Sequence, residues 1–363
     1  SAQDWTFRIT ACHELHRSRA RTVAEGWMIR CALAALYGIW FAWSHRYLRV
    51  PARVLRPLFP LVGYLLKSLG PLFGVKYKVL LHESHARAGR HGWPYYNETA
   101  RTPQSVFTWH PHSALTVMPF TLWQPSEVFG RDVFIGVARQ LFFIPGLREI
   151  LIVGNCRVAD DRVVDQILEG GSSIMMQPGG VHEQVRFRDD HETAYFSANL
   201  GFLRKAVRHG VPVIPMYSFG ENQLYRSRPE RRRISELITR LGLPTPAASG
   251  KLGLPAGLLC LPGSPLLVVG AALSSRRSDP EEEEDAAVVR LFQAYLAALR
   301  SIWRGHCDSL PARVAEKGLR CVYRSGEQGD VASDAEQDDD RLVAAFAARC
   351  RARRLAQGAG PGG

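Results

Sequence analysis

The chain has 363 residues, a formal net charge of +12 and a pI near 9.6, so one large domain or two smaller ones fit its length, and its basic balance favours an anionic partner such as a membrane surface, a phosphorylated substrate or nucleic acid. Its seven cysteines are scattered and form no C-x-x-C pair. This spacing indicates neither a zinc finger nor a disulfide framework, and it fits reduced thiols on a cytosolic face.

The first 80 residues combine positive charge with apolar runs. They hold twelve Lys and Arg against three acidic residues, and uninterrupted or nearly uninterrupted apolar runs occupy 31–43 and 58–66. A spanning helix needs about 20 residues. We therefore expect a membrane-anchoring segment over 1–80, with a hydrophobic hairpin over about 27–67 whose basic flanks stay on the cytoplasmic side. Whether this hairpin spans the membrane or is re-entrant stays open, and a buried core helix at 31–43 is the alternative.

Short apolar runs alternate with helical patterns from residue 105 to residue 270. Strands are predicted at 105–109, 132–137, 172–177, 213–217 and 265–270, and amphipathic helices at 161–168 and 196–209. Strands separated by helices predict a mixed sheet that helices cover on both faces. We therefore expect one α/β catalytic domain over 81–323.

The C-terminal part changes composition twice. Pro280 and four following glutamates predict the start of a helix that runs to about Arg304, since acidic residues stabilise a helix N-terminus. Seven Asp or Glu then lie between 327 and 340, and a short basic segment follows at 341–355. This composition predicts an acidic linker and basic tail over 324–363 that are disordered.

Two histidines bracket a proline at the end of the predicted strand 105–109. In His110-Pro111-His112-Ser113 the proline makes the turn rigid, and Ser113 is placed to cap a following helix. A histidine with a pKa near neutrality is a natural general base for a hydroxyl that attacks a thioester. The alternatives are a structural histidine, or a metal pair with His182 as the third ligand.

Three further clusters contain residue types that carry chemistry. Gly179 and Gly180 follow a predicted strand and allow the backbone to approach a ligand, with Glu183 just beyond them, and Glu221 and Asn222 follow the strand 213–217. Strand ends are where α/β sheets place their sites. The basic positions of the third cluster are Arg204, Lys205 and Arg208. These cations either contact phosphates or are simply solvated.

Taken in order, these segments resemble one known family. HPHS is followed by LREILIVGNC at 147–156, by QPGGVHE at 177–183, and by LGFLRKAVRHGVPVIPMYSFGENQLY at 200–225. This set resembles the type 2 diacylglycerol acyltransferases, which include monoacylglycerol acyltransferases and wax synthases, over roughly 105–305. HPHS departs from the usual HPHG and EPHS motifs of the family, and Ala159-Asp160 replaces an expected Ser-Arg.

The resemblance implies a glycerolipid acyltransferase-like fold in an integral membrane protein of the endoplasmic reticulum, with a cytosol-facing active site and access to lipid droplet surfaces. It implies transfer of a fatty acyl group from acyl-CoA to a lipid hydroxyl, with no cofactor, metal or nucleic acid. Diacylglycerol is the first candidate acceptor, and monoacylglycerol and a long-chain alcohol are the alternatives. A homo-oligomer is left open.

The resemblance also assigns roles to residues. His112 is the expected base, with His110 as the alternative, and Glu183 and Glu221 are candidates to orient it, because Leu115 and Val117 stand where related enzymes carry an aspartate. The predicted substrate-binding residues are Pro111, Ser113, Gly179, Gly180 and Asn222, together with Arg204, Lys205 and Arg208 for the CoA phosphates.

Two other classes of function compete with this assignment. A metal-dependent lipid hydrolase would use the two histidines as ligands, whereas a serine hydrolase lacks support because the chain has no G-x-S-x-G motif. A non-catalytic protein that binds lipid surfaces or nucleic acid would also be basic. The charge lies mainly beside apolar segments, which suits anionic headgroups better than a nucleic-acid groove.

Overall fold

The computed structural model describes residues 31, 34–42, 74–75, 78–81, 103–116, 133–240, 245–253, 260–279, 281–325 and 329–358. The chain divides into two compact units, 1–48 and 49–363. In the first unit, residues 34–42 form a helix. None of the helices within the described residues is long and apolar enough to cross a membrane. Most of the predicted hairpin lies outside the described residues, so it stays a prediction.

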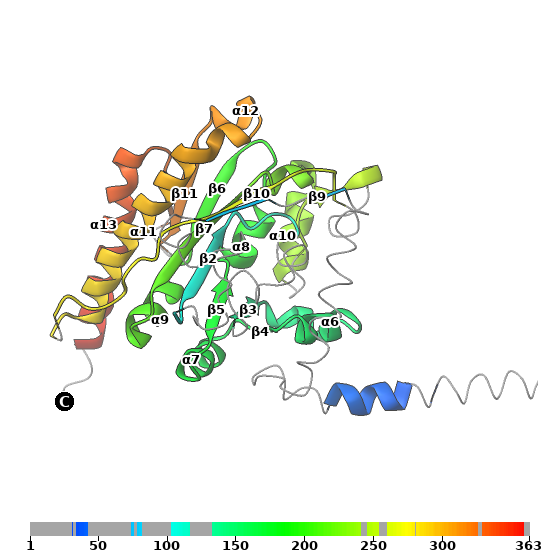
Figure 1. Ribbon diagram of the computed structural model, residues 1–363, viewed down its shortest axis with the longest axis horizontal. Helices are drawn as coiled ribbons and strands as arrows, with labels where there is room; N and C mark the ends of the chain where they lie inside the picture. The colour runs from blue at the N-terminus through cyan, green and yellow to red at the C-terminus, as the bar shows by residue number, and fades with distance from the viewer. Residues whose placement is uncertain are drawn as a thin grey trace, which may run out of the picture. The chain divides into compact units, whose positions relative to one another are not determined.

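A seven-stranded mixed sheet forms the centre of the second unit (Figure 1). Its order is β1-β10-β7-β2-β5-β3-β4. The strands are β1 (Lys78–Leu81), β2 (Val106–His110), β3 (Val133–Val137), β4 (Cys156–Val158), β5 (Ser173–Met176), β7 (Val213–Phe219) and β10 (Leu266–Val269). The five strands from β7 to β4 run parallel, whereas β10 runs antiparallel to β7. The predicted α/β fold with a mixed sheet is confirmed.

The five predicted strands match β2, β3, β5, β7 and β10 to within two residues. Their apolar runs identify them because central parallel strands are covered on both faces, and β7 is buried at every position. The helix predicted over 196–209 is wrong at its start. Residue Phe196 ends a strand, β6 (Glu192–Phe196), whose alternate residues are fully buried, and the helix α9 begins only at Gly201.

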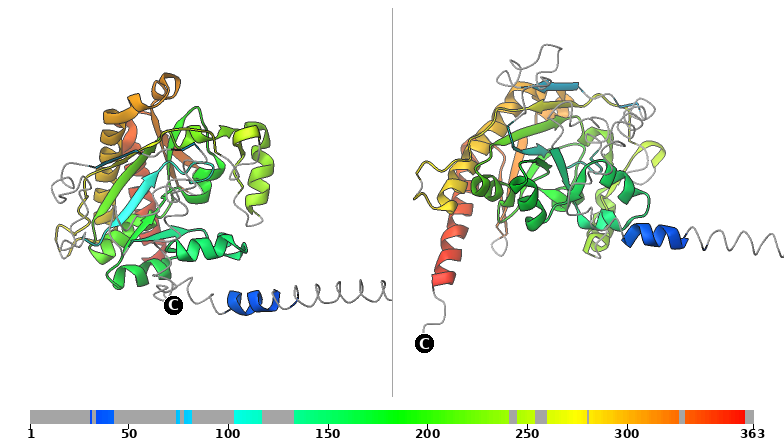
Figure 2. Two further views of the ribbon diagram at one scale, coloured as in Figure 1. Left: turned by 45° about the vertical axis from the view of Figure 1, so that its right-hand side comes forward. Right: turned by 60° about the horizontal axis from the view of Figure 1, so that its bottom comes forward.

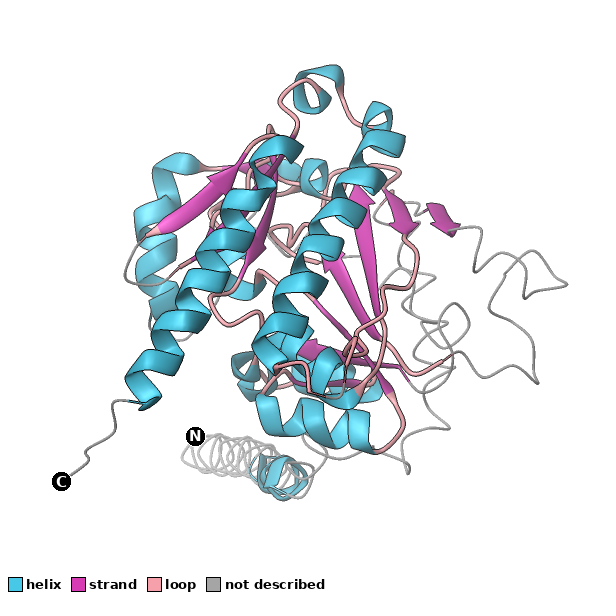
Figure 3. Ribbon diagram, turned by 90° about the vertical axis from the view of Figure 1, so that its left-hand side faces the viewer, coloured by secondary structure: helices cyan, strands magenta, loops and turns pink. Residues whose placement is uncertain are grey.

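Within the described residues, five helices contribute buried side chains to one hydrophobic core with the sheet. Three of them are α7 (Asp161–Glu169), α9 (Gly201–His209) and α11 (Glu284–His306), and the views of Figure 2 and Figure 3 show α11 lying along the strands. Asp160 caps α7 by accepting the N–H of Val163 at 3.0 Å. The other helices are α6 (Leu147–Val153), α8 (Gly180–Val185), α10 (Arg232–Arg240), α12 (Ala312–Ala315) and α13 (Asp339–Gly358).

Short elements complete the unit. The 3-10 turns are η3 (Arg139–Phe143), η4 (Asn222–Leu224), η5 (Pro229–Arg231), η6 (Lys251–Gly253), η7 (Cys307–Ser309) and η8 (Glu336–Asp338), and a two-stranded sheet pairs β8 (Arg226–Ser227) with β9 (Ala248–Ser249). The strand β1 pairs with β10, so the sheet already includes residues of the predicted membrane-anchoring segment.

The C-terminal region is ordered, so the prediction of disorder is wrong for 329–358. Here β11 (Leu319–Arg324) pairs with β6 and with β12 (Asp330–Ser333), and α13 (Asp339–Gly358) packs against α11. Leu342, Phe346 and Cys350 are buried, and they lie on one face because they are four residues apart. Asp339 forms a buried ion pair with Arg300 at 2.8 Å. One acidic residue of the supposed linker is thus an internal counter-ion.

We expect Phe346→Ala to destabilise the protein by about 3 to 5 kcal/mol, because Phe346 is 1% exposed and its ring packs against Phe292 and Tyr323. Leu355→Ala in the same helix is the control, because Leu355 is 75% exposed and its loss should change stability by less than about 0.5 kcal/mol. Denaturant unfolding of the two variants measures both values. Equal effects would contradict the packing of α13 on the core.

Candidate active site

His110 ends β2 in the interior of the sheet. It is fully buried beside the rings of Phe196 and Tyr295, at centroid distances of 5.3 and 6.3 Å. Its Nδ1 lies 3.4 Å from Oε2 of Glu183, and the peptide bond between His110 and Pro111 is cis. His110 does not line the cavity described below. Its position suits support of the neighbouring residues better than contact with a substrate.

His112 is half-buried and lines the cavity. Its Nδ1 lies 3.0 Å from the carbonyl oxygen of Ser113. Because a carbonyl only accepts, Nδ1 carries the hydrogen in this contact, and Nε2 is left with the lone pair. Burial lowers the pKa of His112, and the negative charge of Glu183 opposes this effect only in part. The imidazole is therefore neutral and able to accept a proton near pH 7.

Glu183 connects the histidine turn to the rest of the domain. It is buried in α8, where Oε1 accepts the N–H of His112 at 2.5 Å and Oε2 accepts the N–H of Tyr195 at 3.3 Å. The carboxylate contacts the backbone of His112 and does not contact its ring. Glu183 thus holds the turn in place and acts on the charge of the imidazole through space.

Each of the two glycines in the Pro-Gly-Gly turn is required at its position for a different structural reason. A Cβ on Gly179 would clash with Oε2 of Glu183, so any side chain there would displace the carboxylate. Gly180 has a φ of +50°, and its N–H donates to the carbonyl oxygen of Gln177 at 3.1 Å. The close approach predicted for this turn is therefore made to Glu183, and the N–H of Gly180 is engaged within the turn.

Glu221 and Asn222 lie behind the histidine turn and do not line the cavity. The hydroxyl of Ser113 donates to the carbonyl oxygen of Glu221 at 3.1 Å, while Asn222 donates to Glu192 at 2.9 Å. The prediction that Ser113 caps a helix is wrong within the described part of this segment, because residues 111–116 are not helical. Its hydroxyl instead joins the turn after β2 to the turn after β7.

A buried carboxyl group that the sequence analysis missed lies next to these turns. Glu192, at the start of β6, accepts hydrogen bonds from the Tyr217 hydroxyl at 2.8 Å and from the amides of Asn222 and Gln223 at 2.9 and 3.0 Å. Burial raises its pKa to about 7. The sequence did contain a sign of this burial. Glu192 is two residues before Ala194 and four before Phe196, so in a strand its carboxyl group faces the core as these apolar side chains do.

A cavity of about 520 Å³ opens in front of His112. Most of its wall is apolar, from Trp109 on β2, Ile135 on β3 and Met176 on β5, together with residues of η3, α6 and α8. Near His112, the hydroxyl of Thr116 donates to Gln177, and both residues line the wall. The other polar residues of the wall are Asp160, Asp161, Gln184, Ser197 and Lys205. A mostly apolar cavity fits a lipid-like molecule better than a soluble metabolite.

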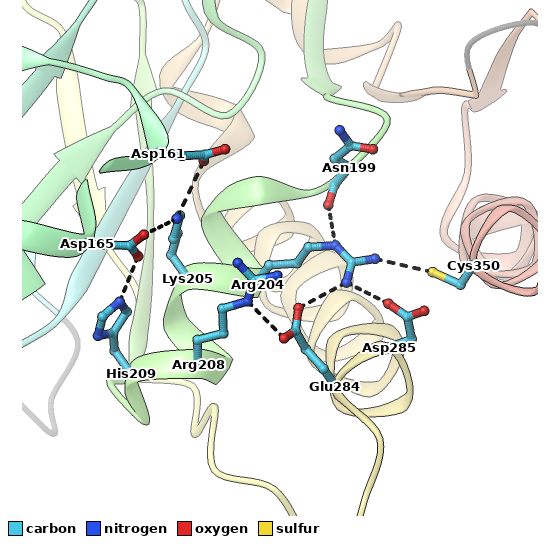
Figure 4. A network of polar contacts seen from close by, with 10 residues as sticks. All are labelled: Asp161, Asp165, Asn199, Arg204, Lys205, Arg208, His209, Glu284, Asp285 and Cys350. Carbon is cyan, nitrogen blue, oxygen red and sulfur yellow. Dashed lines mark hydrogen bonds and ion pairs between the residues drawn. The ribbon is translucent and has the colours of Figure 1, made fainter. Parts of the chain in front are cut away.

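The predicted basic cluster is largely neutralised by acidic side chains (Figure 4). Arg204 pairs with Asp285 at 2.5 Å and Arg208 with Glu284 at 2.8 Å, whereas Lys205 pairs with Asp165 at 2.7 Å. Arg204 and Lys205 are buried, so the prediction of a merely solvated face is wrong for them. Within this cluster, Lys205 is the basic residue that lines the cavity.

The residues suggested for a metal site are not brought together. His182 lies outside the cavity wall, and its Nδ1 accepts a hydrogen bond from Arg186 at 3.0 Å. Within the described residues, no group of three or more His, Cys, Asp or Glu side chains has an arrangement that could hold a metal ion. The six cysteines in this part of the chain are free thiols.

The fold and site define an α/β protein with a neutral histidine at a strand end and an apolar cavity before it. The sequence profile of the family described as diacylglycerol acyltransferase matches residues 97–312, which is more than half of the chain. The chain belongs to this family.

Individual relatives agree with this assignment. Diacylglycerol O-acyltransferase 2 of Xenopus tropicalis is 31% identical over 33% of this chain and 36% of its own length, and human 2-acylglycerol O-acyltransferase 1 is 27% identical over 55% and 64%. The chain thus spans less than two thirds of these relatives. The crystal structure of a 1-acyl-sn-glycerophosphate acyltransferase, PlsC, from Thermotoga maritima has a TM-score of 0.42 at 15% identity, covering 76% of this chain and 90% of that one.

We expect the pKa of Glu192 to make stability depend on pH. The unfolded carboxyl group loses its proton near pH 4.5 and the folded one near 7, so stability is fully present below pH 4.5 and falls as pH rises through 7, by about 3 kcal/mol. Thermal unfolding of Glu192→Gln should lack this fall, whereas Glu169→Gln, at an exposed carboxyl, should retain it. Parallel profiles for wild type and Glu192→Gln would contradict the raised pKa.

Proposed function

We propose that the protein transfers a fatty acyl group from acyl-CoA to the hydroxyl of an acylglycerol, with diacylglycerol as the acceptor and triacylglycerol as the product. The observation that carries this proposal is the placement of His112, whose free Nε2 belongs to an imidazole that lines an apolar cavity. Membership of the diacylglycerol acyltransferase family supports the reaction class.

In the proposed reaction, Nε2 of His112 takes the proton from the acceptor hydroxyl as its oxygen attacks the thioester carbonyl. The C–S bond then breaks, the ester forms, and the CoA thiolate leaves and recovers the proton from the imidazolium. No covalent acyl-enzyme and no cofactor are needed. The lowered pKa of His112 serves this step, because the base must be unprotonated before it can act.

Three groups position the base. Glu183 holds the backbone N–H of His112, the Ser113 carbonyl oxygen fixes the tautomer, and the Ser113 hydroxyl ties the turn to the backbone of Glu221. His110 lies behind them against Glu183. Pro111 enters the same arrangement through its carbonyl oxygen, which accepts the Gln177 amide at 3.3 Å.

For acyl-CoA, Lys205 is the best-placed cation of this cluster, because it lines the cavity, whereas Arg204 and Arg208 do not. All three cations pair with acidic side chains. For the acceptor, monoacylglycerol is the second candidate, since one relative carries the name 2-acylglycerol O-acyltransferase 1, and a long-chain alcohol is the third. The basic and apolar composition of residues 1–80 supports a place at the endoplasmic reticulum membrane, with access to lipid droplets and the site facing the cytosol.

We expect His112→Ala to lower acyl transfer at least about 100-fold, the usual contribution of a general base. Membranes carrying each variant, given labelled acyl-CoA with diacylglycerol, monoacylglycerol or a fatty alcohol, report the reaction and the acceptor together. His182→Ala is the control and should retain activity, because His182 lies outside the cavity. Retained activity in His112→Ala, or release of free fatty acid alone by the wild type, would overturn the proposal.

The pH profile of kcat/KM gives a second test. Because burial lowers the pKa of His112, the rise of kcat/KM with pH should have its midpoint below 6.5. Glu183→Gln removes a negative charge that raises this pKa, so the midpoint should move to still lower pH while kcat/KM itself falls. Glu169→Gln is the control. Glu169 is exposed and is not among the groups that shift the pKa of His112, so this change should leave the midpoint unchanged. A midpoint above 6.5 in the wild type would count against His112 as the base.

A further inference from the structure

The helix α10 presents an outward face that combines large apolar side chains with arginines. Ile234 is 62% exposed and Leu237 is 60% exposed, and Arg233 and Arg240 are exposed as well. These positions share one side of the helix, since they recur at spacings of three and four residues. We call these four residues the α10 face. Large exposed apolar side chains next to several positive charges indicate a surface that binds a partner.

The opposite side of α10 is attached to the wall of the cavity. Ser235 is buried and its hydroxyl donates to the carbonyl oxygen of Thr245, while the N–H of Thr245 donates to the Thr239 hydroxyl at 3.3 Å. The next residue, Pro246, lines the cavity. The orientation of α10 is therefore fixed from inside, and Ile234 and Leu237 point away from the core of the domain.

A second set of exposed apolar residues lies on η3, on α6 and in the turn between them, beyond another wall of the same cavity. Phe143, Ile144 and Ile150 are exposed, whereas Leu147 and Leu151 from α6 line the cavity. In Figure 1 and in both views of Figure 2, α6 and α10 lie on the side of the molecule away from α11 and α13. Exposed apolar side chains thus lie on elements that form the cavity wall, η3 and α6, and on α10, which is attached to that wall.

The charge around α10 identifies the partner. Residues 226–240 contain six arginines and two glutamates, a net charge of +4. A basic helix with exposed Ile and Leu fits the interface of an anionic bilayer, where arginines meet phosphates and apolar side chains enter the acyl region. We propose that the α10 face docks on the surface of a membrane that contains anionic phospholipid. Docking would turn the cavity toward the membrane, and the value of that orientation rests on the proposed function. Lipid binding by the α10 face does not rest on it.

Cosedimentation of the full chain with vesicles of phosphatidylcholine, with and without phosphatidylserine, tests the proposal. Ile234→Ser with Leu237→Ser should weaken binding to both kinds of vesicle about tenfold. Arg233→Gln with Arg240→Gln should weaken binding about tenfold only where phosphatidylserine is present, and added salt should reduce the difference. Leu355→Ser with Arg351→Gln, on the exposed side of α13, is the matched control and should bind as the wild type does.

A second measurement separates docking by this face from anchoring by the rest of the chain. Phospholipids brominated on the acyl chain should quench tryptophan fluorescence more in Leu237→Trp than in the wild type. In Leu355→Trp they should cause no additional quenching. Equal binding of all variants together with no quenching at position 237, or an equal loss of binding in the α13 control, would overturn the proposal. Acyl transfer that persists in such a case leaves the proposed function intact, and vesicle binding that persists in His112→Ala leaves the docking surface intact.

Discussion

The hydrogen bonds of one buried carboxylate determine how the site is assembled. Glu183 accepts the backbone N–H of His112 with one oxygen and the N–H of Tyr195 with the other, so the end of β2, the helix α8 and the strand β6 meet at a single side chain. A buried carboxylate is costly unless donors surround it. That requirement explains Gly179, since any Cβ at that position would occupy the space of the carboxylate.

Burial then sets the chemistry of the histidines. A low-dielectric environment disfavours the imidazolium, which keeps His112 neutral, and the carbonyl of Ser113 selects the tautomer that leaves Nε2 free. His110 is buried more deeply and faces aromatic rings, so two histidines in one motif have different surroundings and different capacities. The second buried carboxyl, Glu192, fixes the turn after β7, which in turn receives the Ser113 hydroxyl.

The C-terminal region closes the domain. The ion pair between Arg300 and Asp339 and the apolar side chains of α13 cover the outer side of α11, whose inner side packs on the sheet. Glu284 and Asp285, at the start of α11, pair with Arg204 of α9. These ion pairs join the two helices and neutralise the arginine. Lys205 differs because it also borders the cavity.

The sequence by itself determined the mixed α/β sheet, five of its strands and the turns that carry the site, because apolar runs and strand-end motifs are local signals. His112 and Glu183 were singled out as candidates in this way. Tertiary structure decided which groups meet: that Glu183 holds the backbone of His112, that Glu192 is buried, that Arg204 and Lys205 are paired, and that residues 329–358 are ordered. The side chains that pair here are 25 or more positions apart in the chain, such as Tyr217 and Glu192 or Asp339 and Arg300, and local composition carries no record of such pairing.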